Sequence, residues 1–189
     1  MRIALINQFY PPDLAPTGQM LEGVVNALVK EGHEVSVLCS KGGYGKADGD
    51  EAQEIDAVDA SMANPRILRV GTLGLGRLAK FAKVADYASF LMFGTARLLL
   101  LRPRPERVVV LSTPPFLSVY ARLVSKLTGS DHGHWIMDVY PDVIRAHGML
   151  EEDAWFYRVL ERLMRWGLGG SRCAVIHTLS HDMADTLNG

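Results

Sequence analysis

Short apolar runs alternate with longer stretches of helical periodicity along most of the chain. The apolar run at 2–10 continues into two consecutive prolines, which bar a helix, so we expect a buried strand that ends in a loop. In 19–32 the apolar residues recur at helical spacing, and the pattern stops at Gly32. A β-branched run at 33–40 then completes a predicted βαβ unit.

The same alternation continues toward the C-terminus. Further strands are predicted at 66–71, 107–113, 134–140 and 173–180, and helices at 76–102, at 116–128, at 142–166 with a break near Gly148, and from Ser180 onward. Residues 41–64 lose this periodicity and gather Gly, Asp, Glu and Ala, which predicts a long, mobile, acidic loop.

Strands that alternate with helices in this way predict an α/β fold, a Rossmann-like doubly wound parallel sheet of about six to seven strands. In the common strand order 3-2-1-4-5-6, a ligand crevice opens above the carboxyl ends of the first and fourth strands. We therefore expect three loops around one site, namely Phe9–Gln19, Ser112–Phe116 and Asp138–Asp142.

Length and composition place the chain among ordinary globular domains. It has 189 residues, 48% hydrophobic and 22% charged, and its net charge of -1 excludes a globally basic nucleic-acid binder. Two cysteines without zinc-site spacing and an N-terminus without a signal-like run predict a reducing, cytoplasmic setting. We expect no metal site, because the six histidines are scattered, and His132 and His134 are expected to be solvated.

The loop before the first helix is a candidate binding loop. Thr17 and Gly18 are placed at the N-terminus of a helix, where free amides and the helix dipole favour an anion or a sugar oxygen. The alternative is a helix-capping Thr17 with nothing bound. The dinucleotide fingerprint, the P-loop and the nucleophile elbow are all absent from the sequence, which argues against NAD- or ATP-binding domains and α/β-hydrolases.

Asp138 is the strongest candidate for chemistry. It interrupts an apolar strand near its carboxyl end, where a lone carboxylate is costly unless it is paired or used. It is therefore either a base or hydroxyl-orienting group, or a structural anchor bonded to backbone amides or to Arg145. Asp142 needs no such role, because it can cap the following helix.

Basic side chains concentrate in one part of the chain. Residues 66–107 hold nine basic and two acidic side chains, and the apolar stretch 87–101 within them is shorter than the roughly twenty residues that span a bilayer. This segment is either a crossover helix packed on the sheet or a helix lying in a membrane interface, and 76–87 suits the interface best. The aromatic-rich segment 155–166 is expected to be buried against the sheet or a partner domain.

Several of these segments together resemble a known family. "INQFYPPDLAPTGQ", "EGHEVSVLCS", "LSTPPF", "WIMDVYPDV" and "LSHDMADTL" are similar, in order and spacing, to the N-terminal domain of glycosyltransferase family 4, retaining enzymes of the GT-B fold. The resemblance covers nearly the whole chain. It is nearest to the bacterial branch that acts on lipid-linked precursors of cell-surface polysaccharides.

The resemblance implies that 1–189 is an acceptor-binding half without its donor domain, and thus a chain inactive by itself. The implied activity is a hexosyltransferase-type transfer from a nucleotide-sugar, bound mainly by the missing domain, to a lipid-linked or glycan acceptor. It implies no metal and no further cofactor. The charge balance predicts no nucleic-acid partner, and the basic segment 66–107 predicts a peripheral location at the inner face of the plasma membrane. The rival interpretations are a non-catalytic Rossmann-like module for a nucleotide or headgroup, and a nucleotide-sugar epimerase.

The resemblance also assigns residues to roles. Asp138 stands where many members of the family have a histidine, and we expect it to orient or partly deprotonate the acceptor hydroxyl. The expected substrate-binding residues are Thr17, Gly18, Gln19, Thr113, Pro114, Phe116 and Tyr140. Independently of the resemblance, the basic amphipathic pattern of 76–87 makes Arg77, Lys80, Phe81 and Lys83 the expected membrane-contact residues.

Overall fold

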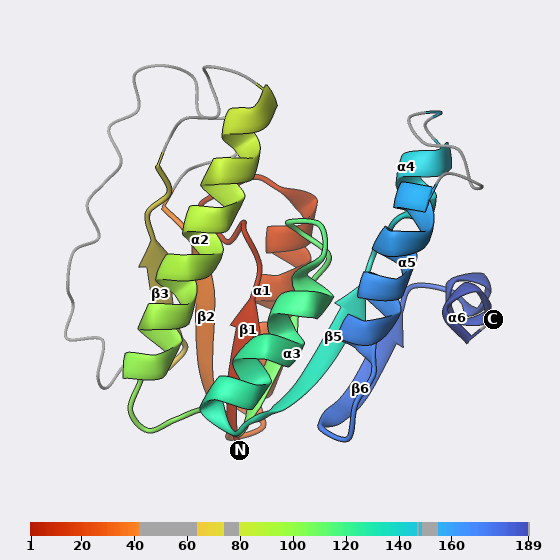
Figure 1. The fold of residues 1–189 in the computed structure, drawn as a ribbon. Coiled ribbons are helices and arrows are strands. Elements are labelled where there is room, and N and C mark those ends of the chain that lie inside the picture. The colour runs from red at the N-terminus through yellow and green to blue at the C-terminus, as the bar shows by residue number, and fades with distance from the viewer. Residues whose placement is uncertain (42–63, 74–79, 147, 149–154, 189) are drawn as a thin grey trace. The chain divides into compact units, whose positions relative to one another are not determined.

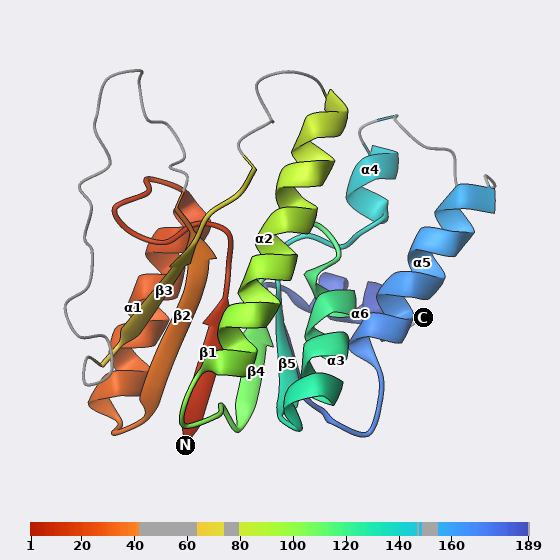
Figure 2. The same ribbon diagram turned by 60° about the vertical axis from the view of Figure 1, so that its left-hand side comes forward.

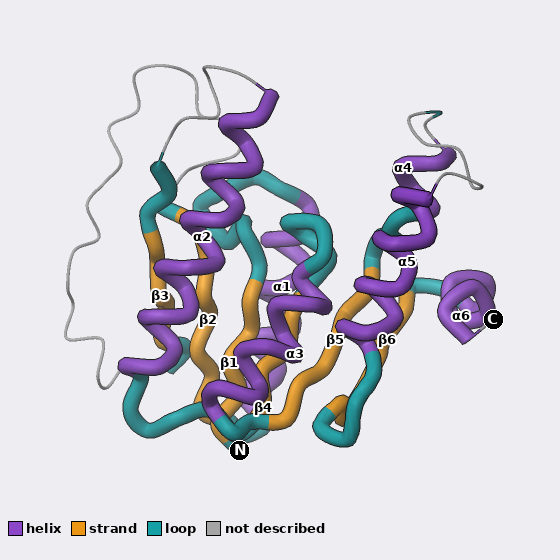
Figure 3. Tube along the Cα trace, in the orientation of Figure 1, coloured by secondary structure: helices purple, strands orange, loops and turns teal. Residues whose placement is uncertain are grey.

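The computed structural model describes residues 1–41, 64–73, 80–146, 148 and 155–188. The chain forms two compact units, Met1–Pro105 and Glu106–Gly189. Strands alternate with helices in both units, as Figure 3 shows by colour.

The first unit is a parallel three-stranded sheet with helices on both faces. Its elements are β1 (Arg2–Ile6), α1 (Pro16–Lys30), β2 (Glu34–Ser40), β3 (Arg66–Val70) and α2 (Lys80–Leu100). The strand order is β3-β2-β1, with Ile3 of β1 beside Val35 of β2, and Val37 of β2 beside Ile67 of β3. Figures 1 and 2 show α1 and α2 on opposite faces of these strands, which is the doubly wound arrangement.

The ends and the buried face of α1 follow from its sequence. Pro16 stands at the first helical position, where its fixed φ suits a helix start. Gly18, Leu21 and Val25 form the buried stripe toward the sheet. At the other end Gly32 has φ +84° and donates to the carbonyl of Val29, which closes the helix where the sequence predicts it to end.

Helix α2 packs on the sheet through part of its surface. Phe90 and Leu98 are fully buried in the first unit, whereas Met92 and Phe93 remain exposed. The helix contacts β2 and β3, so the stretch 87–101 is a crossover helix covering the sheet. Among the residues that the structure describes, no helix is long and apolar enough to cross a membrane.

The second unit repeats the arrangement with its own three strands. Its elements are β4 (Arg107–Val110), α3 (Leu117–Thr128), β5 (Asp131–Ile136), α4 (Asp142–Ala146), α5 (Trp155–Leu168), β6 (Cys173–Thr178) and α6 (His181–Asn188). The strands are parallel in the order β4-β5-β6. Figures 1 and 2 show α3 and α5 side by side along these strands.

Close packing of α3 against α5 depends on one glycine. A Cβ atom on Gly167 would lie 2.6 Å from the backbone nitrogen of Val119, so only glycine fits where the two helices meet. Next to this contact, Ile136, Met164 and Leu168 form a buried apolar cluster between β5 and α5. The hydroxyl of Ser118 donates to the sulfur of Met164 at 2.9 Å within the same interface.

These observations confirm the predicted fold class, because every predicted strand is present and the six strands are parallel with flanking helices. Each unit carries one half of the predicted strand order. The strands at 2–10, 107–113 and 173–180 are shorter than predicted. The predicted acidic loop 41–64 lies outside the described residues except for its two ends.

One prediction about burial was wrong. His132 and His134 are each 1% exposed, because β5 begins at Asp131, three residues earlier than predicted, and pairs there with β4. The segment 155–166 packs toward the sheet with one face: Tyr157 and Met164 are buried, Met164 beside Ile136 of β5, whereas Trp155 is 74% exposed.

Candidate functional site

The loop after β1 is held in place by a buried asparagine. Asn7 follows the strand directly, is fully buried, and its Nδ2 donates to the carbonyl of Phe9 at 2.7 Å and to Oγ1 of Thr17 at 3.4 Å. The guanidinium of Arg69 on β3 donates to the carbonyl of Pro11 in the same loop. The loop between β1 and α1 is therefore fixed from both sides within the first unit.

The start of α1 differs from the predicted anion site. The amides of Gly18 and Gln19 both donate to the carbonyl of Ala15, at 2.9 and 3.2 Å, so neither is free for a ligand. Thr17 is not the capping residue either, since Ala15 holds that position without a side-chain bond. Gly18 does allow a close backbone approach, but to Phe9 and Tyr10 of the protein, 3.2–3.3 Å from where its Cβ would be. Gln19 is exposed.

In the second unit, a serine joins the loops that follow β4 and β5. Ser112 is buried just beyond β4, and its Oγ accepts the backbone N–H of Met137 at 2.8 Å and that of Asp138 at 3.3 Å. One hydroxyl thus fixes the backbone on which the candidate carboxylate stands. This is the contact that brings Asp138 to the carboxyl end of β4.

An aromatic pair lies between the same two loops. The rings of Phe116 and Tyr140 are 5.7 Å apart between centroids and tilted by 45°. Phe116 has φ +63°, the left-handed region that a bulky residue rarely adopts, directly before α3. Such backbone outliers persist only where the surrounding structure holds them in place, and they are concentrated at functional sites. Pro114 is buried beside this corner, and Thr113 is half-buried.

Asp138 lies outside the sheet, contrary to the prediction that it interrupts a strand. β5 ends at Ile136, and Asp138 follows in a bend with its side chain half-buried. Arg145 contacts Asp142 instead, with Nη2 3.3 Å from Oδ1, in the short helix α4 that Asp142 begins. Asp142 also accepts the hydroxyl of Tyr157 at 2.9 Å, and burial followed by this bond raises the pKa of Tyr157 to about 12.

The expected substrate-binding residues therefore fall into two groups. Asp138, Tyr140 and the corner at 113–116 lie together in the second unit, whereas Thr17, Gly18 and Gln19 lie in the first. That the two groups face one ligand stays a prediction.

Two residues at these loops were missed by sequence reasoning. Asn7 and Ser112 are the first buried polar residues after β1 and β4, and each organises its loop. The signal available in the sequence was their position, a hydrogen-bonding side chain where a buried strand ends. Oδ1 of Asn7 has no hydrogen-bond partner among the described residues and is closed off from solvent.

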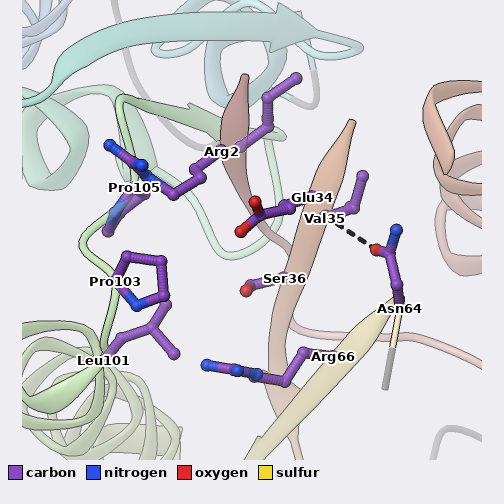
Figure 4. A pocket seen from close by; sticks show the side chains of 10 residues that line it. Arg2, Glu34, Val35, Ser36, Asn64, Arg66, Leu101, Pro103 and Pro105 are labelled. Atoms are coloured by element: carbon purple, nitrogen blue, oxygen red, sulfur yellow. Dashed lines mark hydrogen bonds between the residues drawn. The ribbon is translucent and has the colours of Figure 1, made fainter. Parts of the chain in front are cut away.

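A pocket of the first unit lies at the opposite ends of the strands (Figure 4). Arg2, Glu34 and Arg66 begin β1, β2 and β3 and line it. Much of its polar lining is already bonded within the protein: Asn64 accepts the amide of Val35 at 3.0 Å, and Arg66 donates to the carbonyl of Arg102 at 3.1 Å. This hollow is thus not the predicted crevice, which requires the carboxyl ends of the strands.

The predicted membrane-contact residues fall at the edge of what is described. Arg77 lies outside the described residues, and for Lys80, Phe81 and Lys83 only the helical backbone of α2 is described. Their role stays a prediction.

Comparison with known proteins agrees with the architecture. Residues 17–189 match the model of a protein family described as "Glycosyl transferase 4-like domain". Among curated proteins, no match was found.

Solved structures resemble the chain in fold. The crystal structure of LpCGTa in complex with UDP has 11% sequence identity, a TM-score of 0.57, and a match covering 98% of this chain and 47% of that one. The crystal structure of Arabidopsis thaliana UGT89C1 complexed with UDP has 15% identity and a TM-score of 0.51, with 95% and 42% covered. The chain thus spans less than half the length of these structures, and at such identities the likeness is one of fold alone.

Proposed function

Because the chain belongs to the glycosyl transferase 4-like family, we propose that it forms the acceptor-side half of a retaining glycosyltransferase with two domains. This enzyme moves a sugar, of hexose type, from a nucleotide-sugar to a lipid-linked or glycan acceptor in the synthesis of cell-surface polysaccharide. The family match over residues 17–189 is the observation that carries the proposal.

The loops at the carboxyl ends of β4 and β5 support an acceptor site in the second unit. A half-buried carboxylate, an aromatic pair and a strained corner stand together there. In this proposal the carboxylate of Asp138 accepts a hydrogen bond from the hydroxyl group of the acceptor substrate. This bond aligns the hydroxyl oxygen for attack on the sugar. Phe116 and Tyr140 give the acceptor an apolar wall, and Ser112 keeps Asp138 in position.

The nucleotide-sugar, in this proposal, is bound mainly by a second domain. The first unit contributes Thr17 to the cleft, and the buried Asn7 positions it through a hydrogen bond to its hydroxyl. No amide of Gly18 or Gln19 is offered to a phosphate, because both are bonded to Ala15. The first unit therefore contributes side chains rather than a helix terminus. A donor screen begins with UDP-sugars, because both structural relatives were crystallised with UDP.

The test replaces Asp138 in a protein that carries this chain together with its donor domain. We expect Asp138→Asn to lower kcat by about 10²–10⁴-fold, the usual contribution of a general acid or base, with little change in the KM for the donor. Asp131→Asn is the matched control, because Asp131 is exposed at the other end of the same strand and should leave turnover unchanged. Unchanged turnover in Asp138→Asn, or an equal loss in both variants, contradicts the assigned role. Tight binding of UDP by this chain alone would contradict the division of labour between the domains.

We further propose that the protein works at the inner face of the plasma membrane as a peripheral protein. The support is the basic excess of residues 66–107 in a chain of net charge -1. A lipid-linked acceptor requires such a location, and basic residues near anionic headgroups contribute about 1 kcal/mol each.

A further inference from the structure

Three ligand-type side chains meet at the beginning of β5 and β6. His132 and His134 are two residues apart on β5 and therefore point to the same face of the sheet. Cys173, the first residue of β6, is the partner of His132 in the register of the two strands. One ring nitrogen of each histidine and the Sγ of Cys173 all lie within 4.8 Å of one another.

The two imidazole rings are buried, and three of their four ring nitrogens lack a hydrogen-bond partner among the described residues. Both rings are 1% exposed, and within the described part of the chain Nε2 of His132 and both nitrogens of His134 have no hydrogen-bond partner. A buried polar group without a partner destabilises a fold, because its hydrogen bonds to water are lost and not replaced. Three such atoms on two neighbouring rings, whose centroids lie 5.2 Å apart, are unusual in a native core, and a bound ion would satisfy one on each ring.

The hydrogen bonds around His132 select its tautomer. The Ser125 hydroxyl donates to the carbonyl of Ser130 at 2.6 Å, so its lone pair is left to accept from Nδ1 of His132 at 3.3 Å. Nδ1 then carries the proton, and Nε2 is left with a free lone pair. Ring nitrogens that ligate metals are commonly oriented in this way by a bond at the opposite nitrogen.

A metal binds Cys173 as the thiolate, so binding of the metal releases the thiol proton to solvent.

We propose that His132, His134 and Cys173 form a binding site for a zinc ion. Imidazole and thiolate are the ligands that zinc prefers, and three protein ligands leave a fourth position for water. Metal–ligand bonds of about 2.0–2.3 Å place the ligand atoms of a tetrahedral site about 3.3–3.7 Å apart, so small side-chain movements close this one.

The zinc site is separate from the candidate acceptor site. It lies at the start of β5, whereas Asp138 follows the other end of the strand. It joins β5 to β6 where their register shifts between His132 and Gly133, a point at which the backbone ladder is interrupted. The inference is independent of the proposed transferase activity.

Cobalt provides the test, because Co²⁺ takes zinc sites and reports its ligands in its absorption spectrum. We expect the full 189-residue chain, without a histidine tag, to bind one equivalent of Co²⁺ with a thiolate-to-cobalt band in the near ultraviolet, and Zn²⁺ to abolish the band. Cys173→Ser should remove the band and weaken Zn²⁺ binding at least a hundredfold. Cys39→Ala is the matched control, because Cys39 is buried in β2 of the other unit, and this variant should keep the band.

Thermal unfolding supplies a second measurement on the same proteins. Zn²⁺ should raise the Tm of the wild type and of Cys39→Ala but not that of Cys173→Ser, whose folding is checked by circular dichroism. The absence of a cobalt band in the wild type, or a band that survives in Cys173→Ser, overturns the proposal.

Discussion

Two glycines on the same helix have very different surroundings. Gly18 faces the loop after β1, and a Cβ there would lie 3.2 Å from the carbonyl carbon and oxygen of Phe9. That loop has little room to move, because the bond from Asn7 fixes the Phe9 carbonyl. Gly23, further along α1, has no atom within 4 Å of the corresponding point.

We therefore expect opposite effects from the same substitution at these two positions. Gly18→Ala should lower the free energy of unfolding by about 1–2 kcal/mol, because the added methyl group meets backbone that cannot yield. Gly23→Ala should raise it by about 0.5–1 kcal/mol, because alanine restricts the unfolded chain and favours a helix. Thermal unfolding followed by circular dichroism compares the two variants with the wild type. Equal effects would mean that the loop yields to the methyl group.

For individual residues, the sequence indicates which side chains are candidates for a function better than it indicates their burial and secondary structure. Asp138 and Tyr140 were both predicted within the strand 134–140, but β5 ends at Ile136 and both residues follow it, so the argument that Asp138 is buried in a strand was wrong. His132 and His134 were misjudged because nothing in their local sequence shows that the backbone already pairs with β4 at Asp131. Burial of a histidine depends on which strands lie beside it, and that information is not local.

The pairing of α3 with α5 illustrates what a helix sequence alone conceals. Periodicity in 155–166 predicts an apolar face, but not that Gly167 lets the helix approach the backbone of Val119. Arg122 of α3 lies with its guanidinium carbon 4.3 Å from the ring centre of Trp166, which covers part of a half-exposed aromatic. The contact between these helices is thus closest at Gly167 and has a cationic side chain at its edge.

Two adjacent residues of α5, Leu163 and Met164, lie on its exposed and its buried face respectively. Met164→Ala should destabilise the second unit by about 2–5 kcal/mol, since Met164 is 5% exposed and its removal leaves a cavity beside Ile136. Leu163→Ala should change stability by about 0.5 kcal/mol or less, because Leu163 is 43% exposed. Urea unfolding followed by tryptophan fluorescence measures this unit specifically, because all three tryptophans lie in it. Similar losses in both variants would contradict the assigned packing.

Element ends were predicted less well than element types. Apolar residues continue past the last paired residue of β1 and β4, where Tyr10 and Leu111 are still buried although their segments have left the sheet. Hydrophobicity reports burial, whereas a strand ends where its backbone pairing ends. The helix ends at Gly32 and Gly129 were easier to predict from the sequence. Each of these residues has a positive φ, a conformation for which glycine is the favoured residue.

For the molecule as a whole, the membrane proposal rests on charge and is open to a direct test. Lys80→Gln combined with Lys83→Gln removes two charges from the basic segment and should weaken binding to vesicles containing anionic phosphatidylglycerol about 30-fold, at about 1 kcal/mol per residue. Lys30→Gln with Lys41→Gln is the control, because both of these lysines are exposed elsewhere in the first unit. Flotation with anionic and neutral vesicles measures the difference. Binding that ignores lipid charge would refute the proposal.

At the same scale, the sequence predicted the class of fold and the family, because both depend on the order of many weak signals. The alternation of strands and helices survives errors of several residues at each boundary. The prediction of a binding site does not survive such errors, because a site depends on individual atoms. The amide of Gly18 is an example, since it donates to the carbonyl of Ala15.

The position of Cys39 has a practical consequence for anyone who handles the protein. This thiol on β2 is fully buried, and burial raises its pKa to about 12, so at neutral pH it is protonated as well as shielded. Electrophiles attack thiolates, and they can reach this sulfur only while the structure around it opens. The rate at which Cys39 is alkylated therefore reports how often the first unit opens transiently.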